Sequence, residues 1–236
     1  MSDLDLTSSS DREAFCANAW FAALPRAAQD AMVEHSHRVP VKEGTMLYRV
    51  GDPTGTFYGL RSGLLKISSS RPDGKEAILS MLEPGLWFGE MSMVDKLPRT
   101  HDATAVVDSV VLAMRSDAFD RLMERPDFSS GIARLLATRM RLLFAVLEDS
   151  VLRPTLARVA RRLVLLSHGD STLASDSRRV VPVSQGQLAM MLGITRQTLA
   201  KELHVMIGAG ALATRYGRVE IVSVERLQAF ADDAQA

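Results

Sequence analysis

Apolar residues recur three and four positions apart along several stretches of the chain, which is the spacing of one face of an amphipathic helix. These stretches are residues 12–36, 116–128, 129–150, 155–167 and 184–207. Between Val39 and Met114 the pattern changes to short alternating apolar runs, separated by turns at Gly44, Gly51, Gly63, Gly74 and Gly85. Turns at intervals of about 8–12 residues indicate an all-β sandwich or barrel. The pattern therefore predicts an α+β chain with a β-rich first half and a helical second half.

The longest apolar stripe runs along residues 129–150. Its members are Ile132, Leu136, Met140, Leu143, Leu147 and Val151. A face this apolar must be covered. A second copy of the helix could cover it, as could the β domain of the same chain, or both could share it. We expect a homodimer through residues 129–151, with a hinge at Arg153-Pro154, because proline ends a helix.

Residues 183–212 predict two short helices joined by a tight turn. Ser184 and Gln187 have the spacing of a capping box, and Gly193 can end the first helix in the left-handed conformation. Thr195 can cap the second helix. Four residues of that helix are expected to point inward: Leu199, Leu203, Met206 and Ile207.

The outward face of the second helix carries Arg196, Gln197 and Lys201 directly after Thr195. In a helix-turn-helix, residues at this position meet base edges in the major groove. Arginine matches guanine, glutamine matches adenine, and lysine suits guanine or phosphate. The sequence therefore predicts DNA recognition, and the alternative is a helical hairpin with a solvated polar face.

An alternating apolar pattern surrounds Tyr216-Gly217 and indicates a β-hairpin after the second helix. A hairpin in this place forms a wing. Arg215 and Arg218 flank its turn, where they are suited to backbone phosphates.

Charge is divided unevenly, although the whole chain is neutral. Residues 153–236 carry 11 Lys and Arg against 7 Asp and Glu, a net of +4, whereas residues 1–152 carry 17 against 21, a net of −4. Phosphate contacts favour a basic face. The division agrees with DNA binding by the C-terminal half.

Composition sets the remaining bounds. No apolar run reaches the 18 or so residues of a membrane span, and the polar residues 1–12 resemble no secretory signal, so we expect a disordered tail. Cys16 is the single cysteine, which excludes internal disulfides and a four-cysteine cluster. We expect a cytoplasmic protein with no membrane partner.

Two short motifs in the β-rich half suggest an anion site. Gly89, Glu90 and Met91 follow an aromatic pair, and Arg99-Thr100 follows nine residues after Glu90. A turn of small residues exposes backbone amides that can bind an anion. A carboxylate there could take a sugar hydroxyl, and arginine could bind a phosphate bidentately. Surface salt bridges would be the ordinary alternative.

Together these motifs resemble the CRP/FNR family of bacterial transcription regulators. The similar stretches are GTMLYRVGDPTGTFYGLRSGLLKI, PDGKEAILSMLEPGLWFGEMSMVDKLPRTHDATAV and VSQGQLAMMLGITRQTLAKEL. The resemblance covers about residues 15–225. It implies an N-terminal double-stranded β-helix (a β-roll), a long dimerisation helix, a C-terminal winged helix-turn-helix, and RNA polymerase as a partner.

The resemblance also implies domain limits and a ligand. A β-roll of the cyclic-nucleotide-binding kind is expected over residues 13–128, the dimerisation helix and hinge over 129–152, and the DNA-binding domain over 153–236. In cAMP-binding members a Gly-Glu pair and an Arg-Ser/Thr pair hold the ribose and cyclic phosphate, which match Gly89-Glu90 and Arg99-Thr100. A cyclic nucleotide is the candidate small-molecule effector, and no other cofactor is indicated.

The sequence departs from the family pattern at two places, one in the expected effector contacts and one in the recognition helix. Cyclic-AMP-responsive relatives present a Thr-Ser pair to the adenine, whereas Leu143-Phe144 stands there and residues 129–150 contain no such pair. Gln197 also replaces the usual glutamate of the recognition helix, so the preferred base should differ.

Other effectors therefore remain open: cyclic di-GMP, a haem-bound gas, or none. The sequence contains no nucleophile–base motif, metal-spaced cluster or P-loop, so an enzyme is the weaker interpretation.

Overall fold

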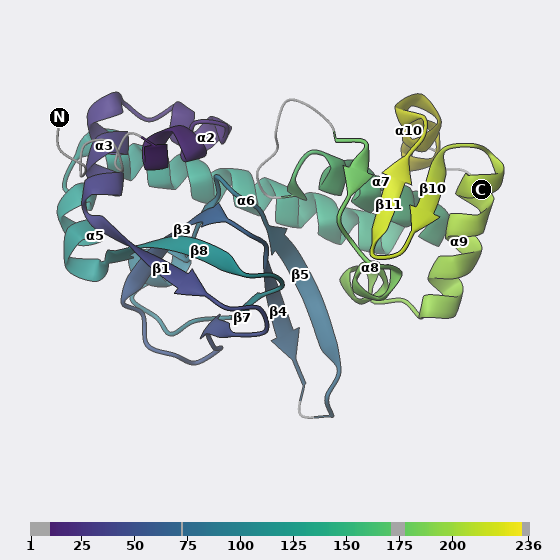
Figure 1. Cartoon of the computed structure of the whole chain (residues 1–236), viewed down its shortest axis with the longest axis horizontal. Coiled ribbons are helices and arrows are strands. Elements are labelled where there is room, and N and C mark those ends of the chain that lie inside the picture. Colours follow the sequence, from purple (N-terminus) through teal and green to yellow (C-terminus); the bar gives the residue numbers. More distant parts are fainter. Residues whose placement is uncertain (1–9, 72, 171–177, 233–236) are drawn as a thin grey trace. The chain divides into compact units, whose positions relative to one another are not determined.

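The computed structural model describes residues 10–71, 73–170 and 178–232 (Figure 1). The chain forms two compact units: Met1–Ser69 with Ser80–Met140, and Ser70–Leu79 with Arg141–Ala236. The expected disorder of residues 1–12 is wrong for residues 10–12, because residues 10–15 are helical and Asp11 is buried; the rest of the expected tail lies outside the described residues. Asp11 forms ion pairs with Arg38 and Arg61, which fix this segment to the first unit.

Eight strands between Ser36 and Arg115 form two antiparallel four-stranded sheets. One sheet has the order β1 (Ser36–Val41), β8 (Ser109–Arg115), β3 (Thr56–Ser62) and β6 (Trp87–Phe88). The other has the order β2 (Met46–Tyr48), β7 (Asp102–Ala105), β4 (Leu65–Ser70) and β5 (Glu76–Leu82). The non-sequential order confirms the predicted β-roll.

Aromatic side chains fill the core between the β-roll and its helices. Trp87 packs against Phe15, Phe21 and Phe57, with ring centroids 5.0–6.2 Å apart. Contacts of this kind add to the burial of apolar area. They join β6 to the N-terminal helix α2 (Ala19–Ala22), and Met32 of α3 (Arg26–Glu34) belongs to the same buried cluster.

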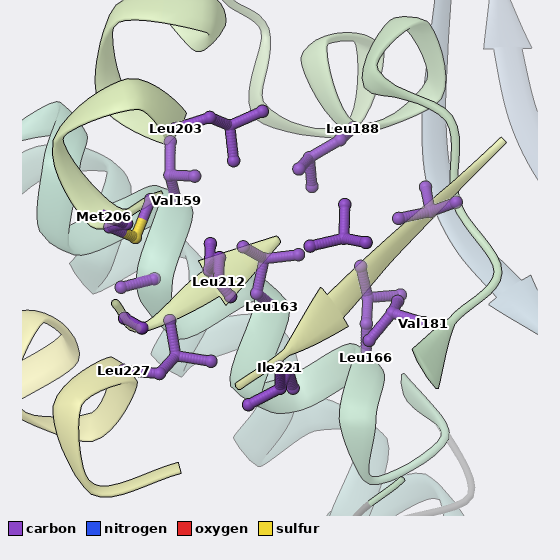
Figure 2. Close-up of a cluster of buried hydrophobic side chains, with 14 of the residues drawn as sticks. Val159, Leu163, Leu166, Val181, Leu188, Leu203, Met206, Leu212, Ile221 and Leu227 are labelled. Atoms are coloured by element: carbon purple, nitrogen blue, oxygen red, sulfur yellow. The ribbon is translucent and has the colours of Figure 1, made fainter. Parts of the chain in front are cut away.

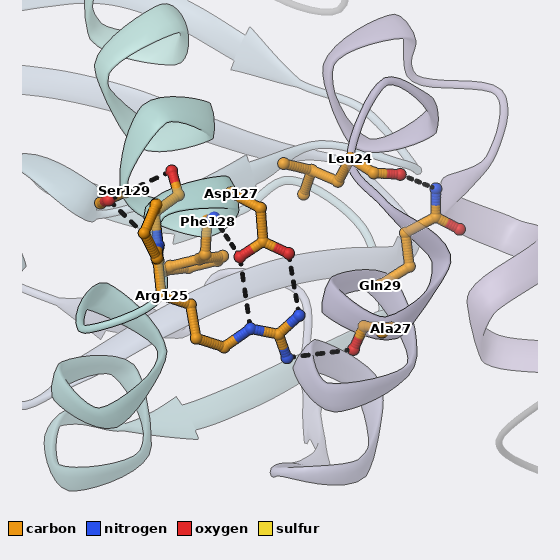
Figure 3. A network of polar contacts seen from close by, with 8 residues as sticks. Leu24, Ala27, Gln29, Arg125, Asp127, Phe128 and Ser129 are labelled. Atoms are coloured by element: carbon orange, nitrogen blue, oxygen red, sulfur yellow. Dashed lines mark hydrogen bonds and ion pairs between the residues drawn. The ribbon is translucent and has the colours of Figure 1, made fainter.

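The long helix α6 (Pro126–Leu152) begins three residues earlier than expected, and α5 (Ser116–Met123) ends earlier. Proline is well tolerated in the first turn of a helix, where its missing N–H has no partner to lose. Asp127 accepts from the backbone N–H of Phe128 and binds Arg125 (Figure 3). Arg125 in turn donates to the carbonyl of Ala27, which ties the start of α6 to α3.

The stripe of α6 has two environments. Its first turns are buried against the β-roll at Phe128, Gly131, Ile132 and Leu135. From Met140 onward all the large apolar side chains except Leu142 are exposed. One part of the stripe is therefore buried in its own chain, and the other part is exposed.

The second unit contains the predicted winged helix-turn-helix. Its elements are α7 (Thr155–Ser167), β9 (Val180–Val181), α8 (Gln185–Leu192), α9 (Arg196–Gly208), β10 (Leu212–Arg215), β11 (Arg218–Ile221) and α10 (Val224–Asp232). Leu163, Leu188, Leu203 and Met206 meet in its core (Figure 2). The predicted inward position of Ile207 is wrong, because this side chain is 38% exposed. The helix α10 had no counterpart in the sequence prediction.

The two units divide within α6, between Met140 and Arg141. Asp149 of α6 forms ion pairs with Arg153 at 2.9 Å and with Arg161 of α7 at 2.7 Å, all within the second unit. The break at Pro154 is present, with α6 ending at Leu152 and α7 beginning at Thr155. Within the described ranges, no helix is long and apolar enough to cross a membrane.

Candidate functional site: a β-roll cavity and a nucleic-acid interface

A cavity of about 120 Å³ opens in the β-roll beside the start of α4 (Glu90–Asp95). It brings together all five residues that the sequence suggested for anion binding: Gly89, Glu90, Met91, Arg99 and Thr100. Its lining also includes residues that the sequence analysis missed: Tyr48, Ile67, Phe88, Ser92 and His101. His101 could have been noticed as the neighbour of Thr100, whereas Tyr48 comes from a distant strand without a local signal.

Gly89 is required by its backbone conformation and by its neighbour. Its φ of 88° lies in the left-handed region, which glycine enters without a side-chain penalty. A Cβ at this position would come within 2.6 Å of Nη1 of Arg99. The Gly89 carbonyl accepts a hydrogen bond of 2.9 Å from that same nitrogen. The glycine thus allows the guanidinium to approach the backbone.

Arg99 is buried and held on three sides. It donates to the carbonyls of Gly89 and Thr56, and its Cζ lies 4.5 Å from the ring centroid of Tyr48. Burial raises the pKa of the Tyr48 phenol well above its ordinary value, against the opposing effect of the Arg99 charge. The ring is therefore neutral, and a guanidinium over such a face is attracted to its quadrupole.

Glu90 is only 1% exposed, and Arg139 of α6 forms an ion pair with it. Arg139 also donates from Nη2 to the carbonyl of Trp87 at 2.6 Å. A buried carboxylate needs such compensation, because removal from water is costly. The pair connects the cavity directly to the long helix. Nothing in the periodicity of residues 129–150 indicated that Arg139 would take this part.

The other two predicted residues are less enclosed. Met91 and Thr100 are exposed, and Oγ1 of Thr100 lies 2.9 Å from Nδ1 of the half-buried His101. Burial lowers the pKa of His101, while the carboxylate of Asp102 raises it by less.

The helix-turn-helix has the predicted local structure. Ser184 and Gln187 form a complete capping box, and Gly193 ends α8 with a φ of 65°. Oγ1 of Thr195 accepts from the backbone N–H of Thr198 at 3.0 Å. These caps satisfy backbone groups that would otherwise lack partners at the helix ends.

The expected base-contacting side chains lie on one exposed surface of α9. Thr195, Arg196, Gln197 and Lys201 are all exposed. The guanidinium of Arg196 lies beside the first turn of α8, where a Cβ on Gly186 would be 3.0 Å from its Nη2. The surface therefore offers polar and cationic groups for nucleic acid.

The wing arginines share an internal partner. Arg215 and Arg218 face each other in the register of β10 and β11. Their Nε atoms lie 2.9 and 3.4 Å from Oε1 of Glu220. Both side chains are more than half exposed, so phosphate can still reach them. The sequence placed the arginines correctly near the turn and missed the carboxylate between them.

Metal binding has little support from side-chain placement. In the part of the chain that the structure describes, no group of three His, Cys, Asp or Glu residues could hold a metal ion.

Known proteins match both parts of the chain. A family model for the cyclic nucleotide-binding domain matches residues 38–126, and one for the Crp-like helix-turn-helix domain matches residues 157–230. The chain is 30% identical over 209 residues to a CRP-like cAMP-activated global transcriptional regulator of Mycobacterium tuberculosis, covering 88% of this chain and 93% of the relative.

Solved structures agree with these matches. A transcriptional regulator of the CRP family from Thermus thermophilus has a TM-score of 0.66 at 27% identity, covering 84% of this chain and 98% of the other. The cyclic di-GMP-responsive regulator CLP of Xanthomonas campestris has a TM-score of 0.69 at 21% identity, covering 85% of this chain and all of the other, and shares the fold.

Proposed function

This chain belongs to the CRP/FNR family of transcription regulators, and we propose that it binds DNA as a homodimer controlled by a cyclic nucleotide in its β-roll. The observation that carries the proposal is the cavity itself. It combines an arginine for a phosphate with a carboxylate for a sugar hydroxyl, and that carboxylate is paired with the long helix.

The uncovered part of α6 supports dimerisation. Leu143 is 68% exposed, Phe144 61% and Val151 73%. Met140 and Leu147 extend the same uncovered stripe. Apolar side chains grouped in this way mark an interaction surface. A second copy of α6 would present the same spacing and so match it along its length.

The ion pair between Glu90 and Arg139 supplies a route for control. A ligand hydroxyl bound at Glu90 would compete with Arg139 for the carboxylate. Freeing or shifting Arg139 would change the contacts that α6 makes with β6. The ligand would then favour one of two arrangements of the dimer helices, which is a shift between existing populations.

The size of the cavity bears on how a nucleotide would bind. Its volume of about 120 Å³ is below the roughly 300–1,000 Å³ of pockets that enclose drug-sized ligands. The phosphate and sugar would occupy it, and the base would extend outward. Leu143 and Phe144 stand where cAMP-responsive relatives are expected to have a Thr-Ser pair, and they offer a base apolar packing without hydrogen bonds.

The ligand class is tested by calorimetric titration of the purified protein with cyclic AMP, cyclic GMP and cyclic di-GMP. Loss of an arginine–phosphate pair in Arg99→Ala should weaken binding by about 1.5–3 kcal/mol. Arg99→Lys keeps the charge without the bidentate geometry, so its affinity for the nucleotide should lie between those of the wild type and Arg99→Ala. Because Arg99 also holds two carbonyls, folding of each variant is checked by circular dichroism. Wild-type affinity in folded Arg99→Ala would exclude this cavity as the phosphate site.

A haem-bound gas is the competing effector, and purified protein with a haem absorption band would favour it.

For DNA, the expected site is a pseudo-palindrome with half-sites about 34–36 Å apart, because a two-fold dimer presents α9 to successive major grooves. RNA polymerase is the proposed partner at promoters. Gln197→Glu should move the preference toward cytosine at one position.

A further inference from the structure

We infer that His101 is a ligand-contacting residue of the β-roll cavity, where its imidazole binds the phosphodiester of the effector and takes up a proton in doing so. The inference rests on the proposed function and adds a residue and a pH dependence to it. Effector affinity would then rise as pH falls, and the regulator would respond to acidity and nucleotide together.

The position of the imidazole carries the inference. His101 lines the same cavity as Arg99 and Glu90. Its Nδ1 is occupied by the hydroxyl of Thr100 at 2.9 Å, and Nε2 has no hydrogen-bond partner among residues 10–71, 73–170 and 178–232. An unoccupied ring nitrogen beside an anion site is a donor for the anion when it carries a proton.

The hydroxyl of Thr100 suits both protonation states. It can donate to Nδ1 when that nitrogen is unprotonated, and it can accept from Nδ1–H when the ring is charged. Thr100 therefore orients the ring through a proton uptake without losing its hydrogen bond. This gives Thr100 a positioning part in addition to the phosphate contact that the sequence suggested.

The charged groups around the cavity would not fully compensate the negative charge of a bound phosphodiester. Glu90 at the start of α4 is paired with Arg139 of α6. Asp102 of β7 accepts from the backbone N–H of Val50 at 2.8 Å. Tyr48 of β2 is held neutral by burial. Arg99 is the cation in the lining, and two of its five N–H donors already bind backbone carbonyls.

The sign of the pH effect follows from these neighbours. Burial lowers the pKa of His101, so the imidazole is neutral at pH 7 before the ligand binds. A phosphodiester beside it favours the charged form and raises the pKa. Between these two pKa values, binding takes up a proton and the affinity changes by up to about tenfold per pH unit. Outside that interval the affinity is constant, because cyclic phosphodiesters do not titrate near neutral pH.

Calorimetry measures the proton directly. The full-length protein is titrated with cyclic AMP, cyclic GMP and cyclic di-GMP in two buffers of different ionisation enthalpy, from about pH 5.5 to about pH 8, which brackets the ordinary histidine pKa. The number of protons that the wild type takes up on binding should pass through a maximum as the pH is varied, and this maximum should approach one. His101→Gln, which retains hydrogen bonding without titration, should take up none and bind with pH-independent affinity.

The matched control is His204→Gln, since His204 is exposed on α9 outside the cavity, and it should behave as wild type. If His101 had only a structural role, His101→Gln would bind the nucleotide more weakly and would still take up the same number of protons. That outcome would overturn the inference. Nucleotide binding by wild type without proton uptake would overturn it too, while leaving the proposed function intact. Failure of every nucleotide to bind would overturn both.

Discussion

The ion pair between Glu90 and Arg139 should contribute measurably to stability. In Arg139→Met, the carboxylate of Glu90, which is 1% exposed in the wild type, would lose its charged partner. Breaking a buried pair in this way costs about 3–5 kcal/mol. The Arg139 side chain is 25% exposed, so water can replace part of the interaction, and we expect about 3 kcal/mol, at the lower end of that range.

Tryptophan fluorescence during urea unfolding measures this loss selectively. The two tryptophans, Trp20 and Trp87, both lie in the first unit, so the signal follows the β-roll. Glu90→Gln combined with Arg139→Met forms a double-mutant cycle, whose coupling energy should be about 1–3 kcal/mol. Arg141→Met is the control, because Arg141 is an exposed neighbour on α6. A cost below about 1 kcal/mol for Arg139→Met, the value of an exposed pair, or no coupling in the cycle, would show that the pair is solvated and cannot transmit ligand binding.

Three further predictions concern the dimer and DNA. Leu143→Asp with Leu147→Asp should give monomers in light scattering, because two buried carboxylates per helix would oppose association; a wild type that is itself monomeric at micromolar concentration would contradict the dimer. Arg196→Ala should weaken specific binding by about 1–3 kcal/mol and relax one base position in selection from random DNA, and an unchanged motif would remove Arg196 from base readout. Glu220→Gln should tighten binding to all sequences and steepen its salt dependence, since two arginines gain freedom to contact phosphate; equal salt slopes for the variant and wild type would show that the wing does not touch the backbone.

Local chemistry accounts for the successes of the sequence analysis. The capping box of Ser184 and Gln187, the stop at Gly193 and the break at Pro154 each depend on residues within a few positions. The stripe of α6 is also a local pattern, and its spacing was sufficient to predict a long helix. The family motifs placed Gly89 and Arg99 at one cavity. The two residues are 10 positions apart in the sequence, and a hydrogen bond joins them.

Pairings between distant segments could not be predicted in this way. Arg139 is one of several arginines on α6, and its choice of Glu90 depends on how the helix lies against β6. Tyr48 meets Arg99 because the end of β2 lines the cavity. Ile207 fits the apolar spacing of α9 and is nevertheless exposed. Periodicity predicts which face of the helix is apolar, but it does not predict how much of that face the neighbouring elements cover.

The burial of Arg99 has a consequence for how the cavity acquires affinity. A surface arginine must shed its hydration when an anion arrives, and that dehydration opposes binding. Arg99 has already exchanged most of its water for two carbonyls and the ring of Tyr48. The unfavourable dehydration is therefore part of folding, and the binding site is preorganised. Variants that loosen the guanidinium from these carbonyls should bind anions more weakly even where they stabilise the β-roll, so affinity and stability oppose each other at this residue.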